Sequence, residues 1–585
     1  MKDEISSLIR QALAAMPAGS LPAEGAQAAI EVDRTRDPAH GDFATSIALR
    51  LAKAARRNPR ELAQAIVAAL PTSDLIAKAE VAGAGFINFR LAPNAYAREL
   101  ERIVAEGARY GSSRVGQGTS VLLEFVSANP TGPLHVGHGR HAAYGASLAN
   151  LLAVTGYDVK REYYVNDAGR QVDILAVSVW LRYLELCGEA ITFPTNGYRG
   201  DYLRPIAQAL LEAEQRRLHR PAAEVFSELP PDAPAGDKEI HVDALIERAR
   251  ALLGAEGFDR VLTFSLDQML AEIRDDLREF GVEFENWYSE RSFVASGAID
   301  RALERLRAEG HIYAKDGAQW FRASAFGDDE DRVVVRENGA KTYFASDIAY
   351  HFDKRSRGFT QLVDVLGADH HGYVARVRAG LVAMGQPADC LEVLLIQLVS
   401  LYRGKEKLAM GKREGQFVTL RQLRAEVGND ACRFFYLMRS NDQHLDFDLE
   451  LAKSRSNDNP VYYIQYAHAR VASVMKQLAD RGLKYEAAVA RANLARLEAE
   501  QEVTLLRTLS RYPEVIQLAA ANRAPHALVH YLRELANDFH TYYNAHQFIV
   551  EDEGLRNARL MLVQGLQQVI RNGLGLLGVS APESM

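Results

Sequence analysis

The fold of this chain is decided by the stretch Ser127-Ala-Asn-Pro-Thr-Gly-Pro-Leu-His-Val-Gly-His138. Two histidines, His135 and His138, stand three residues apart with Gly137 between them. An apolar run over 121–126 precedes the stretch and is typical of a buried strand, and apolar residues at helical spacing follow it. The pattern predicts a strand-to-helix junction with the helix beginning near Gly137. Glycine lets a ligand approach the backbone closely, and free N–H groups at a helix start favour phosphate, so the sequence predicts a nucleotide site.

Around this junction the sequence has the alternating pattern of strands and helices that is typical of a parallel sheet. From about 113 to 455, short apolar runs alternate with helical patterns, for example a strand at Leu362–Leu366 followed by a helix. The rhythm breaks between about 185 and 280, where 221–237 is rich in proline, alanine and acidic residues. We expect an α/β core interrupted by a surface loop or insertion.

The first 112 residues or so predict a small α+β domain. Helical spacing over 44–51 and 62–70 predicts two helices, and 79–91 predicts a hairpin-like strand region. One helix face is expected to be basic, through residues spaced three and four apart: Arg50, Lys53, Arg57 and Arg60. Charge alone slightly favours a solvated helix face over an RNA contact.

From about 456 onward the sequence is helix-dominated, and no strand-like alternation follows Asp458. One apolar face repeats at spacings of four and three: Leu528, Leu532, Leu535, Phe539 and Tyr542. This stripe predicts the core of an all-α bundle rather than a platform for stacking bases.

Composition predicts a large enzyme without membrane segments. The 585 residues suggest about three or four domains. Three cysteines (Cys187, Cys390 and Cys432) lie far apart, which argues against a disulfide framework or a structural zinc site and fits a reducing cytoplasm. The sequence has no apolar signal region at its start and no run of about eighteen apolar residues. With a formal charge of −7, any RNA contact must rely on local basic patches.

The motif His135-Val-Gly-His138 resembles a signature of class I aminoacyl-tRNA synthetases. The longer run Glu124–His138 resembles the arginyl-tRNA synthetase version in particular, and it carries the resemblance because histidine pairs alone often cap helices. The phrases Gly41–Thr45, Gly85–Phe89 and Leu576–Glu583 resemble the same family, so the resemblance covers the whole chain.

The resemblance implies three domains. Residues 1–112 would be the additional domain that contacts the outer corner of the tRNA near its D-loop. Residues 113–455 would form the class I Rossmann-type catalytic domain, with an insertion at about 185–280, and residues 456–585 the helical anticodon-binding domain. With this resemblance, we interpret the basic helix face as an RNA contact rather than a solvated face.

The family's reaction joins arginine to tRNA in two steps. ATP, as its Mg²⁺ complex, and L-arginine give arginyl-adenylate, and the arginyl group then passes to the 3′-terminal ribose of arginine tRNA. The family generally needs bound tRNA before it activates arginine. The resemblance further implies a monomeric cytoplasmic enzyme without membrane attachment or structural zinc.

Two signatures are expected to serve ATP. In the first, His135, His138 and the start of the helix at Gly137 would donate to phosphate oxygens. The second is the lysine-bearing loop of the class I family, within 407–420, where Met410 and Lys412 match the pattern. Ala409 replaces its first lysine and Gly411 its serine, which puts in question how the loop acts without help. Taken alone, such a loop is more often a solvated turn.

The arginine pocket is expected to contain carboxylates, because a carboxylate can bind the forked guanidinium through two hydrogen bonds. By resemblance, Asp347 takes the guanidinium with Tyr343 beside it. The remaining pocket residues would be Glu124, Ser127, Asn129 and His370. Ser127 and Asn129 would hold the α-amino and carboxylate end. Without the resemblance, Asp347 reads as a helix N-cap.

Asp369-His-His has too few ligands at useful spacing for a metal site, which leaves the metal interpretation unsupported. Residues 163–171 and 438–446 also resemble the family, and we give them no individual roles. Three other functions compete with an arginyl enzyme: another class I synthetase, a smaller nucleotidyltransferase, and a tRNA-binding paralogue without catalysis.

Overall fold

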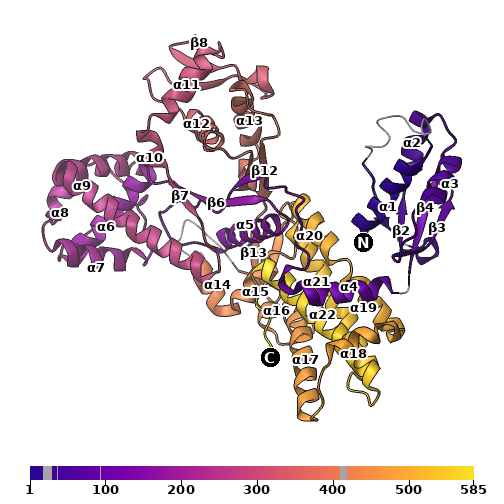
Figure 1. Ribbon diagram of the computed structural model, residues 1–585. Coiled ribbons are helices and arrows are strands. Elements are labelled where there is room, and N and C mark those ends of the chain that lie inside the picture. The colour runs from indigo at the N-terminus through magenta and orange to yellow at the C-terminus, as the bar shows by residue number, and fades with distance from the viewer. Residues whose placement is uncertain (18–28, 36, 93, 409–417) are drawn as a thin grey trace.

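The computed structural model describes residues 1–17, 29–35, 37–92, 94–408 and 418–585 (Figure 1). Its centre is a five-stranded parallel sheet with strand order β12-β11-β5-β6-β7. The strands are β5 (Ser120–Glu124), β6 (Asp158–Val165), β7 (Asn286–Ser289), β11 (Gln361–Gly367) and β12 (Leu391–Ile396). The α/β expectation is confirmed, and both predicted strands are present within two residues of their expected bounds.

Helices pack on this sheet because their apolar faces need cover. Helix α5 (Val136–Val154) begins one residue before the expected position. The other helices of the core are α12 (Tyr343–Ser356), α13 (Tyr373–Ala383), α14 (Leu420–Val427), α15 (Asn429–Tyr436) and α16 (Leu449–Lys453). A second small sheet lies beside them, with order β14-β13-β15. Its strands are β13 (Val399–Arg403), β14 (Glu406–Lys407) and β15 (Leu445–Asp448).

Two insertions interrupt the core. The first is helical and has its own apolar cluster, around fully buried Trp180, at the left of Figure 1. It contains α6 (Arg170–Leu186), α7 (Leu203–Glu214), α8 (Ala222–Val225) and α9 (Lys238–Glu279, broken at Gly254). The second joins a three-stranded antiparallel sheet to two helices. These elements are β8 (Ile312–Lys315), β9 (Ala318–Phe321), β10 (Arg332–Val335), α10 (Glu290–Ala295) and α11 (Ala298–Ala308).

The N-terminal part is an α+β unit with a separate core, at the right of Figure 1. Its elements are α1 (Lys2–Ala15), β1 (Asp33–Arg34), β2 (Phe43–Thr45), α2 (Ile47–Ala55), α3 (Pro59–Ala69), β3 (Ile76–Ala82) and β4 (Phe86–Leu91). Helix α4 (Ala95–Glu106) follows it and packs on the C-terminal bundle, where Leu100 joins the main core.

The basic face expected near residue 50 is divided in this structure. Residues 43–45 form strand β2, so the first predicted helix begins at Ile47, and it ends at Ala55. Arg57 lies between the two helices and Arg60 belongs to α3. The prediction of one continuous basic helix face was therefore wrong.

The C-terminal part is all helical among its described residues. It contains α17 (Pro460–Asp480), α18 (Ala487–Ala492), α19 (Glu500–Leu509), α20 (Tyr512–Ala521), α21 (Pro525–Ala545) and α22 (Glu553–Leu577). The predicted stripe on α21 is fully buried from Leu528 to Tyr542, which confirms that it forms bundle core.

Candidate active site

The two signature histidines form the first turn of α5. His135 is the N-cap residue, and its Nδ1 atom accepts a hydrogen bond of 3.1 Å from the N–H of Gly137. The N–H of His135 donates to Nδ1 of His138 at 3.3 Å, and the two rings stack 3.7 Å apart. The histidines therefore do cap the helix, and this capping fixes both rings at its positive end.

Glycines let α5 lie close to its neighbours. A Cβ atom on Gly145 would come within 2.3 Å of the Phe125 ring, and one on Gly137 within 2.9 Å of Cε1 of His135. Larger side chains would push the helix from the sheet or displace the first histidine.

A strained bend connects β5 to this turn. Val126 and Ser127 have φ values of 69° and 39°, a region that side chains rarely adopt. The Ser127 hydroxyl donates to Oε1 of Glu124 at 2.9 Å and accepts from the N–H of Tyr164 at 3.0 Å. Asn129 is exposed just beyond the bend, where its Nδ2 donates to Gln171 at 2.9 Å. Side-chain hydrogen bonds thus hold the bend and present Asn129 at the carboxyl end of the sheet.

The chain just after the second signature contacts the first. The N–H of Val136 donates to the Val418 carbonyl at 3.3 Å, and the N–H of Leu420 donates to the Leu134 carbonyl at 2.8 Å. Met410 and Lys412 lie outside the described residues. The chain that follows them is thus bound directly to the histidine turn.

Three carboxylates form a row across the sheet beneath the site. Asp364 on β11 is the direct partner of Glu124 on β5, which is the partner of Glu162 on β6. Lys354 of α12 reaches this row and is completely buried. Its Nζ lies 2.6 Å from Oε2 of Glu124 and 2.8 Å from Oδ1 of Asp364. Burial lowers the pKa of Lys354, but the two carboxylates outweigh it and raise that pKa above its ordinary value.

Tyr350 of α12 and Arg357, directly after this helix, also bind the row of carboxylates. The Tyr350 hydroxyl contacts Oε2 of Glu124 at 2.8 Å and Oε1 of Glu162 at 2.7 Å. Arg357 binds both oxygens of Glu162, at 2.6 and 3.0 Å. Burial alone would raise the pKa of Glu162, and the hydrogen bonds from Arg357 bring it below its usual value. The Glu162 carboxylate therefore stays charged.

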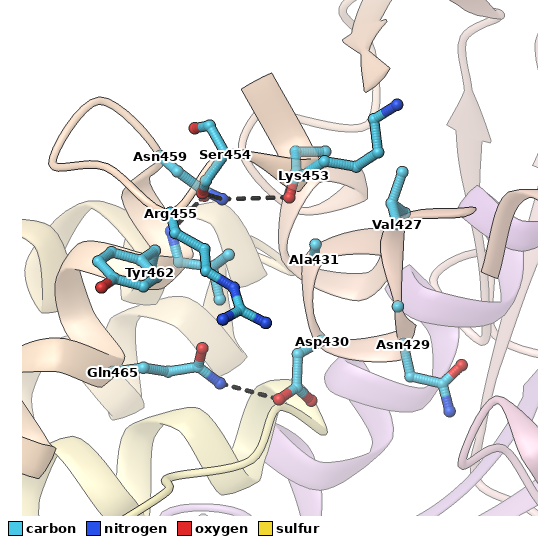
Figure 2. Close-up of a pocket in the computed structure, with 13 residues that line it drawn as sticks. Val427, Asn429, Asp430, Ala431, Lys453, Ser454, Arg455, Asn459, Tyr462 and Gln465 are labelled. Atoms are coloured by element: carbon cyan, nitrogen blue, oxygen red, sulfur yellow. Dashed lines mark hydrogen bonds between the residues drawn. The ribbon is translucent and has the colours of Figure 1, made fainter. Parts of the chain in front are cut away.

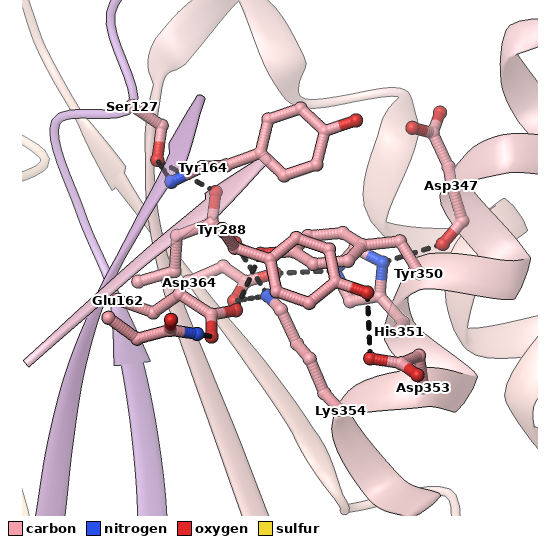
Figure 3. Close-up of polar contacts among 12 residues, drawn as sticks. Ser127, Glu162, Tyr164, Tyr288, Asp347, Tyr350, His351, Asp353, Lys354 and Asp364 are labelled. Atoms are coloured by element: carbon pink, nitrogen blue, oxygen red, sulfur yellow. Dashed lines mark hydrogen bonds and ion pairs between the residues drawn. The ribbon is translucent and has the colours of Figure 1, made fainter. Parts of the chain in front are cut away.

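His351 links the row to the open end of α12, as Figure 3 shows. Its Nε2 lies 2.6 Å from Oδ2 of Asp364, and its Nδ1 lies 2.8 Å from the backbone carbonyl of Asp347. Both partners, a carboxylate and a backbone carbonyl, are hydrogen-bond acceptors.

The Asp347 carboxylate points away from this network (Figure 3). Thr342 is the N-cap of α12 and accepts from the N–H of Ala345 at 3.3 Å, so the alternative of Asp347 as an N-cap is wrong. Burial raises the pKa of Asp347 to about 6, although His351 and a hydrogen bond from Tyr373 lower it. Within the described residues Asp347 forms no ion pair, and its side chain accepts a hydrogen bond from Tyr373.

The other predicted pocket residues are only partly brought together. Glu124 and His370 both influence the pKa of Asp347, Glu124 raising it and His370 lowering it. His370 is half-exposed, with its Nε2 3.8 Å from Oδ2 of Asp369. Tyr343 begins α12 and is 81% exposed.

Sequence reasoning missed Glu290, the first residue of α10. Burial raises its pKa to about 7, helped by the nearby charges of Asp167 and Asp347. Its position directly after strand β7 could have indicated a site residue, because ligands bind at the carboxyl ends of the strands in such sheets. Asp167 lies in the segment 163–171 and accepts from the Ser289 hydroxyl at 2.6 Å.

A separate surface pocket of about 390 Å³ lies between α15 and the start of α17 (Figure 2). None of its lining residues belongs to the predicted site. Gln465 donates to Asp430 there at 2.8 Å, and Asn459 donates to the Ser454 carbonyl at 2.8 Å. This pocket is a junction between the core and the bundle.

Membrane-spanning helices are absent from the described residues, since none is both long and apolar enough to cross a bilayer. In the same residues no group of three or more histidine, cysteine or acidic side chains is placed to hold a metal ion.

Comparisons with known proteins agree with this geometry. Three family models match the chain: the arginyl tRNA synthetase N terminal domain at 3–91, the class I (R) tRNA synthetase catalytic domain at 99–186, and the DALR anticodon binding domain at 464–585. Among solved structures, the Thermus thermophilus arginyl-tRNA synthetase matches with a TM-score of 0.75 and 25% identity, over 100% of both chains. A Mycobacterium tuberculosis methionyl-tRNA synthetase, at 14% identity and a TM-score of 0.51, shares the fold alone.

Curated relatives match over the full length. An arginine–tRNA ligase of Thioalkalivibrio sulfidiphilus is 58% identical over 100% of both chains, and one of Legionella pneumophila is 53% identical over 100% of both. The chain therefore belongs to the arginine–tRNA ligase family, the arginyl-tRNA synthetases of class I.

Proposed function

We propose that this chain activates L-arginine with ATP and transfers it to arginine tRNA. The full-length 58% identity to an arginine–tRNA ligase carries this conclusion. In the first step a carboxylate oxygen of arginine attacks the α-phosphorus of MgATP, and the bond to pyrophosphate breaks. In the second, a 3′-terminal ribose hydroxyl attacks the arginyl carbonyl, and AMP leaves.

The first turn of α5 is the proposed site for the ATP phosphates. His135 and His138 stack at the positive end of a long helix, which favours an anion there. Gly137 allows close approach of the nucleotide. Lys412 and Met410 belong to the segment whose downstream end is bound to this turn, and Lys412 would stabilise charge on the leaving pyrophosphate.

Asp347 is the proposed acceptor for the guanidinium. Burial disfavours the charged form of Asp347 and raises its pKa to about 6. A bound guanidinium would stabilise that charged form. Glu290 adds a second carboxyl group with a raised pKa, close enough to be influenced by the charge of Asp347. Tyr343 would cover the guanidinium from the start of α12, and His370 would line the pocket.

The other end of arginine would contact the bend after β5. Ser127 and Asn129 are presented there, and Glu124 holds Ser127 by a hydrogen bond of 2.9 Å. Glu124 is already paired with Lys354, so its main proposed role in the arginine site is to fix this bend and to add negative charge near Asp347.

We also propose the division into residues 1–112 for the tRNA outer corner, 113–455 for catalysis and 456–585 for the anticodon. The matched family models, with their bounds at 3–91, 99–186 and 464–585, support it. Family membership also supports a monomeric enzyme that acts in the cytoplasm.

Activation is proposed to depend on tRNA, because Ala409 and Gly411 depart from the family's lysine-bearing loop. The test is arginine-dependent exchange of pyrophosphate into ATP, with and without tRNA that carries an arginine anticodon. Exchange only with tRNA is expected. Exchange in both conditions would remove the dependence and keep the enzyme, whereas no exchange in either, with tRNA still bound, would favour a catalytically inactive paralogue.

A further inference from the structure

Helix α21 presents a basic surface at its first turns. His526, His530 and Arg533 follow one another at spacings of four and three, so they share one face of the helix. The rings of His526 and His530 lie 6.1 Å apart. Arg439, in the loop between α15 and β15, belongs to the same surface. Burial is the main cause of the lowered pKa of His530, and the nearby charges of Arg533 and Arg439 lower it further.

These side chains have hydrogen-bond donors that are not paired within the described residues. Arg439, His530 and Arg533 are exposed, and within the described residues none makes a hydrogen bond or an ion pair. Of the neighbouring acids, Glu534 pairs with Arg511, while Asp442 accepts from Ser440 and its charge raises the pKa of His526, opposing the effect of burial. Nδ1 of His526 is shielded from solvent and has no hydrogen-bond partner.

The Arg439 loop is attached to the active-site edge of the sheet. Asn441 donates to the Leu395 carbonyl at 3.0 Å and accepts from the N–H of Gln397 at 2.8 Å, at the carboxyl end of β12. Buried Arg140 of α5 donates to the carbonyls of Gln397 and Ser440, both at 2.8 Å. The loop is therefore held by the helix that begins with the signature histidines.

Helix α21 is joined to α5 as well. The Tyr144 hydroxyl of α5 donates to the Arg523 carbonyl just before α21, and Arg523 pairs with Glu392 of β12 at 2.9 Å. The basic surface thus spans the line where the helical bundle meets the edge of the catalytic sheet, with rigid attachments on both sides.

We propose that Arg439, His530 and Arg533 bind phosphates of the tRNA sugar–phosphate backbone where its acceptor arm approaches the catalytic sheet. This inference rests on the proposed function. Guanidinium groups suit phosphate because they donate two parallel hydrogen bonds, and a histidine with a lowered pKa contributes a neutral donor. The chain carries a formal charge of −7, so its RNA affinity must come from such local surfaces.

The test is tRNA binding to the full chain at several salt concentrations. Removing two phosphate contacts with the double variant Arg439→Ala/Arg533→Ala is expected to make the slope of log affinity against log salt shallower by about 2. Affinity at physiological salt should fall roughly tenfold. His530→Ala should weaken binding above about pH 7 without changing the slope, because a neutral donor displaces no counterion.

Arg204→Ala on α7 of the helical insertion is the control for the loss of an exposed arginine away from this surface. It should leave the slope unchanged, and all variants should keep the wild-type melting temperature. A double variant with the wild-type slope and tRNA affinity would overturn the proposal and show a merely solvated face. Failure of the wild-type chain to charge tRNA would instead count against the proposed function.

Discussion

Oε2 of Glu124 lies 2.6 Å from Nζ of Lys354, a lysine with no exposed surface at all. This contact joins the strand before the nucleotide turn to the helix that carries Asp347. Two buried charges so close are stable only when each keeps its partner. The contact therefore fixes the position of α12 relative to β5, and with it the arginine pocket relative to the ATP turn.

Lys354→Met should destabilise the protein strongly. It leaves the buried carboxylates of Glu124 and Asp364 without their ammonium, and the free energy of unfolding should fall by about 3 to 5 kcal/mol. Tyr350→Phe removes only hydrogen bonds and should cost about 1 to 3 kcal/mol. Urea unfolding followed by circular dichroism measures both. Equal, small losses would mean that the row of carboxylates does not hold α12.

Asp347→Asn should impair the use of arginine far more than that of ATP. The amide keeps the shape of the side chain but loses the charge, so kcat/KM for arginine should fall at least about a hundredfold. The KM for ATP should stay near the wild-type value. Asp353→Asn, on the same helix and bonded to Tyr288 at 2.9 Å, is the matched control and should change arginine use little. An unchanged arginine KM and turnover in Asp347→Asn would remove Asp347 from the pocket.

The same substitution should stabilise the free protein at neutral and alkaline pH. The pKa of Asp347 is raised to about 6, so its carboxyl group favours the folded state at low pH, and that contribution is lost as pH rises through about 6. At about pH 8, Asp347→Asn should therefore raise the free energy of unfolding by about 1 to 2 kcal/mol, with little effect at about pH 4. Thermal unfolding at both pH values tests this, and a gain of equal size at low pH would contradict the electrostatic cause.

Arginine use should depend on pH through two carboxyl groups. Glu290 has a pKa of about 7 and Asp347 a pKa of about 6, and both must be ionised to attract a guanidinium. As pH falls, kcat/KM for arginine should decline near 7 and more steeply below 6. In Glu290→Gln only the lower decline should remain. A variant that keeps the full wild-type profile would exclude Glu290 from arginine binding.

His138→Ala should slow activation without unfolding the chain. If the ring donates to a phosphate oxygen as charge develops, turnover should fall by about a hundredfold or more. His138→Asn restores a polar atom near the His135 N–H and controls for the lost cap, which is worth about 1 kcal/mol. Should Asn restore full turnover, capping rather than phosphate contact would explain the histidine.

Periodicity was enough to predict the parallel sheet, the helix after His135 and the buried stripe on α21, because each depends on apolar spacing within one element. It misplaced the basic face because a turn at Arg57 separates Arg50 and Lys53 of α2 from Arg60 of α3, although the four residues have helical spacing in the sequence. The Asp347 N-cap alternative failed because Thr342, five residues earlier, caps the helix.

Long-range partners could not be read from the sequence. Lys354 is more than two hundred residues from Glu124, and nothing local to either residue predicts their contact. Glu290 comes near Asp347 only because the end of β7 and the start of α12 lie at the same edge of the fold. The roles of Met410 and Lys412 remain predictions, since they lie outside the described residues.

The most direct test is charging of tRNA by the purified full chain, with labelled arginine, MgATP and tRNA that carries an arginine anticodon. The account predicts an ester of arginine at the tRNA 3′ end that requires ATP, and none when lysine replaces arginine. tRNA that binds the chain but stays uncharged with arginine would contradict the central claim.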